Sequence, residues 1–175
     1  RLGKPYVSLN QSSVNDYRDG SKKATLSQVN AGIIRRDILR LNDAKAALNK
    51  ISTNELIEIS AKAGELFLKA DLPVGVDGAT HSPEDYISTL SSTSGLPHVM
   101  VRRNMDKIHY ALSNLKLILN GLTRGLDLSV LDNGFGEQAG SPVCFFPTTQ
   151  ALGLVMPSNS PAVNSLWLPS IALKV

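Results

Sequence analysis

The sequence predicts an α/β protein, with an amino-terminal layer of helices, then a β-hairpin, then the first strand, turn and helix of a parallel sheet. Apolar residues recur with helical spacing in much of residues 27–120, alternate with polar ones in residues 126–131, and form a continuous run in residues 151–156. A chain of 175 residues with 42% hydrophobic and 19% charged residues is also typical of a globular protein that buries a core.

Composition excludes several classes of partner. The chain has 18 Lys and Arg against 15 Asp and Glu, and these basic residues are scattered, so no nucleic-acid partner is expected. No stretch has the length and purity of a membrane helix, so no membrane partner is expected either. A single cysteine excludes an internal disulfide. We therefore expect a cytoplasmic protein.

The first half of the chain is predicted to be an arm followed by two helices. Residues 1–26 are mixed and polar, which favours an extended arm with at most short strands such as residues 5–9. From Ser27, apolar side chains recur at steps of three and four as far as Leu48, as on one face of a helix. Ser52 and Glu55 have the spacing of a capping box and are expected to open the next helix.

Two further helices are predicted before residue 121. Ser82 is a capping residue followed by proline at the first helical position, and this helix is expected to end near Gly95. A long helix is expected over residues 97–120, with Gly121 as its stop.

A hairpin is predicted within residues 125–150. Residues 126–131 alternate like a strand, the sequence Asp132-Asn133-Gly134 is a turn signal, and residues 142–149 can pair back. Because an isolated hairpin has a poor core, its edge is expected to pair with another subunit, which predicts a homo-oligomer.

The apolar run of residues 151–156 is expected to be a buried strand, followed by the turn Pro-Ser-Asn-Ser-Pro at residues 157–161 and an amphipathic segment at residues 162–175. A turn at the carboxyl end of a parallel strand points into a ligand crevice. An Asn side chain held by a stiff turn can donate to an oxyanion, so Asn159 is the candidate catalytic residue. The alternative is that Ser158, Asn159 and Ser160 only cap the helix.

This order of elements resembles the aldehyde dehydrogenase superfamily, in which the strand is followed by Pro-Trp-Asn-Phe-Pro. Pro157, Asn159 and Pro161 match that motif in register, and residues 93–97 look like the family's Glu-Thr-Gly-Lys-Pro segment. The resemblance implies an arm and the helical part of a cofactor-binding domain in residues 1–124, an oligomerisation hairpin in residues 125–150, and the start of a Rossmann-like sheet in residues 151–175. The chain would then be an incomplete aldehyde dehydrogenase-like fold.

The resemblance also implies a reaction that uses NAD or NADP. In the family a thiolate attacks the aldehyde carbonyl, hydride leaves to the nicotinamide, and water or CoA releases the thioester. Asn159 would supply one donor of the oxyanion hole. The residues that would line the cofactor pocket are Val155, Met156, Pro157 and Ser158. Because the family's nucleophilic Cys lies in a second domain, far beyond the motif, this segment alone is expected to be inactive.

Departures from the family leave two alternatives open. Ser158 and Ser160 replace the usual Trp and Phe, so contacts made by those rings are absent. Residues 165–175 look closer to CoA-acylating members and acyl-CoA reductases, which makes an acyl-CoA substrate the first alternative. The second alternative is a non-enzymatic helical interaction module.

The remaining candidate residues are expected to have structural roles. Cys144 has no basic neighbour in sequence that would lower its thiol pKa, so we expect it to be buried as a small hydrophobe. Glu84 and Asp85 are expected to cap a helix. No metal site is expected, because the three histidines follow no ligand spacing; they are His81, His98 and His109.

Overall fold

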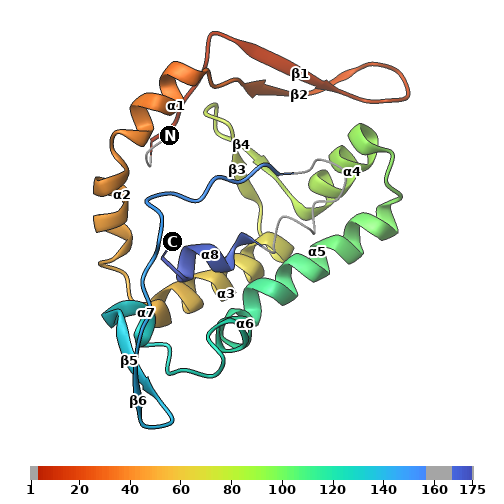
Figure 1. Ribbon diagram of the computed structural model, residues 1–175. Helices are drawn as coiled ribbons and strands as arrows, with labels where there is room; N and C mark the ends of the chain where they lie inside the picture. Colours follow the sequence, from red (N-terminus) through yellow and green to blue (C-terminus); the bar gives the residue numbers. More distant parts are fainter. Residues whose placement is uncertain (1–3, 157–166, 175) are drawn as a thin grey trace.

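The computed structural model describes residues 4–156 and 167–174. Within these residues the fold is mixed α/β, with three two-stranded antiparallel hairpins, of which β1–β2 and β5–β6 lie at opposite ends of the molecule (Figure 1). The elements in chain order are β1 (Gln11–Asn15), β2 (Lys22–Ser27), α1 (Ala31–Ile38), α2 (Leu41–Leu48), α3 (Thr53–Lys69), β3 (Leu72–Val74), β4 (Ala79–His81), α4 (Pro83–Ser94), α5 (His98–Ser113), α6 (Leu115–Leu122), α7 (Val130–Asn133), β5 (Phe135–Gln138), β6 (Ser141–Cys144) and α8 (Pro169–Ala172).

The helix starts expected from capping sequences are confirmed. The hydroxyl oxygen of Ser52 accepts a hydrogen bond from the Glu55 backbone N–H (3.2 Å) at the start of α3. Ser82 and Asp85 form a reciprocal capping box at the start of α4, with proline at the first helical position. Gly95 ends α4 at φ 78°, a left-handed conformation that glycine adopts without strain.

Two of the expected helices are each divided into two. The helix expected over residues 27–48 begins at Ala31 and breaks at residues 39–40 between α1 and α2. The helix expected over residues 97–120 breaks at Asn114, whose side-chain amide donates to the Tyr110 carbonyl (2.8 Å). Because this side chain competes for a helical carbonyl, the sequence can turn there without Gly or Pro. Gly121 lies inside α6 rather than ending it.

The core lies along α3, and it has two parts. One cluster joins α3, α6, α7 and α8, and its buried members are Leu56, Leu115, Leu119, Leu128, Val130, Leu131 and Ala172. The second lies between α4 and α5 and contains Ile87, Val101 and Met105. The close approach of α3 and α5 occurs at Gly64, where an added Cβ would lie 3.1 Å from the Leu112 Cβ.

The predicted hairpin within residues 125–150 exists, but its strands and turn differ from those expected. Residues 126–131 are not a strand, because their leucines and valine enter the core through a turn and α7. Gly134 (φ 77°) ends α7 instead of forming the hairpin turn. The strands are β5 and β6, joined by Ala139 and Gly140, both with positive φ as in a type I′ turn.

Two other expectations for extended segments are corrected. The amino-terminal arm contains the hairpin β1–β2, which attaches to α4 through a hydrogen bond from the Tyr17 N–H to the Ser92 carbonyl (2.9 Å), and residues 5–9 are not a strand. Residues 151–156 form no strand, since no described strand lies beside them to complete a ladder. The parallel sheet is therefore not formed among residues 4–156 and 167–174.

Candidate functional site

The sequence-predicted site falls at the edge of the described structure. Asn159, Pro157 and Ser158 lie in residues 157–166, outside the described residues. The two described candidates for cofactor binding are both exposed, Val155 by 99% and Met156 by 46%. These two side chains alone do not form a cofactor site, so no cofactor geometry follows from them.

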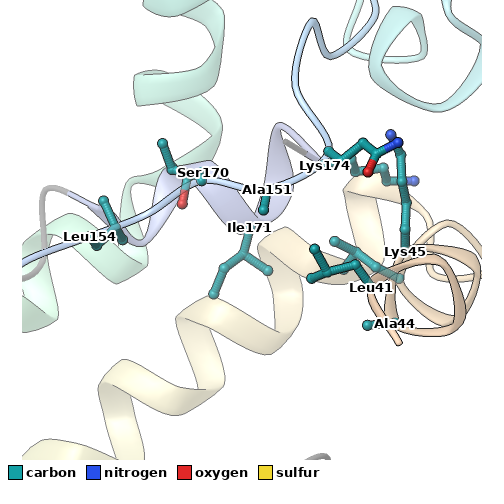
Figure 2. A pocket seen from close by; sticks show the side chains of 11 residues that line it. Leu41, Ala44, Lys45, Ala151, Leu154, Ser170, Ile171 and Lys174 are labelled. Atoms are coloured by element: carbon teal, nitrogen blue, oxygen red, sulfur yellow. The ribbon is translucent and has the colours of Figure 1, made fainter. Parts of the chain in front are cut away.

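A pocket of about 280 Å³ lies immediately before the predicted turn (Figure 2). Three segments far apart in sequence form its walls: α2, residues 150–154 and α8. The lining residues are Leu41, Ala44, Lys45, Leu48, Gln150, Ala151, Leu152, Leu154, Ser170, Ile171 and Lys174. Amphipathic spacing places Leu41, Lys45 and Leu48 on one face of α2, which is why that face meets the other two segments. We treat this pocket as the candidate site.

The charges of the pocket lie at one end. Figure 2 shows Lys45 and Lys174 at one end of the pocket and Leu154 at the other. The Lys174 ammonium donates to the Asp132 carboxylate (2.6 Å), which makes this pair neutral overall. Lys45 is half-buried, and its side-chain ammonium has no hydrogen bond or ion pair with any other described residue. The pocket therefore has one uncompensated positive charge.

The electrostatics of Asp132 depend on three segments. Burial raises the pKa of its carboxyl, but hydrogen bonds from Lys174 and from Thr53 outweigh burial and hold the pKa below its usual value. The carboxylate accepts the Thr53 backbone N–H at 3.0 Å and the Thr53 hydroxyl at 2.8 Å. Asp132 stays ionised at neutral pH and stabilises the positive amino end of α3.

A Ser-His-Glu cluster between α3 and α5 was not predicted from the sequence. The His109 Nε2 lies 2.9 Å from the Glu65 Oε1 and 3.2 Å from the Ser113 hydroxyl. A nucleophilic triad needs the serine and the carboxylate on different ring nitrogens, and here both face Nε2. The cluster joins two helices and does not activate Ser113. The four-residue spacing of His109 and Ser113 was visible in the sequence, but the approach of Glu65 was not.

The structure tests the expectations for Cys144 and for the acidic pair. Cys144 is exposed on the outer face of β6, so the expectation that it is buried is wrong, because Val143 and Phe145 take the inward positions of that strand. Asp85 caps α4 as expected. Glu84 instead makes a bidentate ion pair with Arg102 of α5 (2.7 Å for both hydrogen bonds). This ion pair was not predicted from the sequence, because it depends on how α4 packs against α5.

No group of three His, Cys, Asp or Glu in residues 4–156 and 167–174 is arranged to hold a metal ion. In the same residues, no helix combines the length and the apolar character needed to cross a membrane.

Comparison of the chain with protein-family models, with curated proteins and with solved structures found no match.

Proposed function

We propose that the chain is part of an NAD(P)-dependent oxidoreductase that acts on an aldehyde through a thiohemiacetal and a thioester. The observation that carries the proposal is the sequence Pro-Ser-Asn-Ser-Pro at residues 157–161, which predicts a turn and follows an apolar segment after a helical layer and a hairpin. In this proposal the Asn159 amide donates to the carbonyl oxygen as that oxygen becomes negative. The prolines restrict the turn, so less entropy is lost in holding that donor in place.

The uncovered surface of residues 151–156 and of the first two helices supports the proposal. Neither α1 nor α2 has a buried residue, although both are amphipathic. The chain exposes 11920 Å², against about 8300 Å² expected for a compact monomer of this length. Amphipathic helices of this kind are typical of α/β proteins, in which their apolar faces pack against further structure.

The decisive experiment is the substitution Asn159→Ala in the full-length protein, assayed for aldehyde oxidation with NAD and with NADP. Loss of an oxyanion donor is expected to lower kcat by about 100-fold or more. Asn164→Ala, in the same region but outside the motif, is the matched control and should retain activity. Unchanged turnover in Asn159→Ala would contradict the proposal and favour a helical interaction module.

A CoA-linked reaction is the second form of the proposal, supported by the sequence SLWLPSIALKV at residues 165–175. Here CoA rather than water would release the acyl group from the thioester. Turnover measured with and without CoA separates the two forms. Product formation that does not depend on CoA would eliminate the acyl-CoA form.

We also propose that the protein self-associates through the hairpin β5–β6. The strand register places Phe135 opposite Cys144, and Phe146 follows two residues after Cys144. The two rings are 68% and 67% exposed, whereas Val143 and Phe145 point inward. An exposed face with two aromatic side chains on a two-stranded hairpin is typical of an interface.

A further inference from the structure

We propose that the pocket between α2, residues 150–154 and α8 binds a compact carboxylate with an apolar body, and that Lys45 pairs with the carboxylate. The inference depends only on the residues that line this pocket (Figure 2). It does not depend on the proposed oxidoreductase activity.

The apolar part of the ligand is indicated by side chains that the fold leaves open. Leu152, Leu154 and Ile171 converge on the pocket and are between 39% and 51% exposed. Burial of such surface is favourable at about 25 cal/mol per Å². The pocket offers about 280 Å³, near the lower limit for small-molecule sites, so the ligand has roughly ten non-hydrogen atoms.

The carboxylate is indicated by the charge balance. Lys174 is neutralised by Asp132, and the one carboxylate on α2, Asp43, pairs with Arg40 at 3.5 Å. The ammonium of Lys45, a half-buried residue, thus has no counter-charge among the described residues. One uncompensated cation among mostly apolar walls fits a monoanion better than a doubly charged phosphate.

Ser170 and Gln150 are the neutral polar side chains of the pocket wall. The Ser170 hydroxyl already donates to the Trp167 carbonyl (2.6 Å), so its proton is in use. Gln150 adds an amide that can donate a neutral hydrogen bond to the ligand. Because Lys45 and Leu154 lie at opposite ends, the ligand binds with its carboxylate beside Lys45 and its apolar body toward Leu154.

Octanoate is a suitable probe, since it has one carboxylate and a short apolar chain. Titration of the isotope-labelled protein at low salt, followed by NMR, should give saturable shifts at Ala44, Lys45, Ala151 and Ile171. Lys45→Gln and Lys45→Met each remove the charge, and Lys45→Met keeps most of the aliphatic stem. Both are expected to weaken binding at least 10-fold. Lys50→Gln, an exposed lysine just after α2, is the matched control and should change the affinity less than twofold.

Three results would overturn the inference. They are the absence of saturable shifts at the pocket residues, equal binding of 1-octanol and octanoate, and unchanged octanoate affinity in both Lys45 variants. Asn159→Ala keeps every described residue of the pocket lining and should leave octanoate binding unchanged. A failure of the proposed enzyme function is thereby distinguished from a failure of this site.

Discussion

The ammonium of Lys174 lies 2.6 Å from the carboxylate of Asp132, and this contact joins the end of α8 to α7. The same carboxylate accepts two hydrogen bonds from Thr53, the first residue of α3. Lys174 is only 7% exposed and Thr53 is buried. The Asp132 side chain therefore connects α7 to α3 and to the end of α8. Its two partners lie 79 and 42 positions away from it in sequence.

Asp132→Ala is expected to lower the free energy of unfolding by about 2–4 kcal/mol. The variant leaves the buried Lys174 ammonium without a partner and removes the acceptor of two Thr53 hydrogen bonds at the start of α3. Denaturant unfolding followed by circular dichroism measures the change. Addition of Lys174→Met to Asp132→Ala should recover part of the loss, because no unpaired charge remains. Asp43→Asn, at an exposed ion pair, is the control and should cost less than about 0.5 kcal/mol.

Glu65 should make stability depend on pH in the acid range. Hydrogen bonds from Lys69 and then from His109 lower the pKa of Glu65 from 4.5 to about 2. Because the folded-state pKa lies below the unfolded one, the stabilisation is complete above about pH 4.5 and is lost as pH falls toward 2. The difference in unfolding free energy between the wild type and Glu65→Gln should shrink over that window. Glu58→Gln, which removes an exposed carboxylate from the same helix, is the control. Its difference in unfolding free energy from the wild type should not shrink over that window.

Gly64→Val is expected to destabilise the protein where α3 meets α5. Even a Cβ at this position would lie 3.1 Å from the Leu112 Cβ and 3.3 Å from the His109 ring, and valine adds two more methyl groups. Overpacking of this kind costs about 1–3 kcal/mol, which lowers Tm by roughly 3–10 °C for a chain of this size. Thermal unfolding tests this. Gly121→Ala in α6 meets nothing within 4 Å and should instead raise stability by up to about 1 kcal/mol.

Replacement of both Phe135 and Phe146 by Ser should abolish self-association, since these rings supply most of the apolar surface on the outer face of β5–β6. Analytical ultracentrifugation measures the association. Cys144 is exposed and pairs with Phe135 across the hairpin, so its thiol should react faster with a thiol reagent in the double variant than in the wild type. Leu117→Ser, at an exposed leucine of α6, is the control. Association that persists in the double variant would place the interface elsewhere.

Local sequence alone was enough to predict where α3, α4 and α5 begin and which helix faces carry apolar residues. Ser52, Ser82 and Gly95 act within one turn of the chain, so their capping roles are local and could be read from spacing. The helical content also follows from local periodicity. The candidate role of Asn159 is likewise an argument from sequence, and it stays a prediction because residues 157–166 are outside the described structure.

Other features depend on tertiary contacts, because periodicity alone does not distinguish a strand from a turn that enters the core or a buried side chain from an exposed one. Residues 126–131 alternate like a strand, but Leu128, Val130 and Leu131 gain more by entering the core beside α3 and α6. Cys144 is exposed because its neighbours in β6 occupy the inward positions. Lys45 and Lys174 lie far apart in sequence and meet at one pocket. Each of these outcomes depends on contacts between distant segments, whose free energy no local pattern contains.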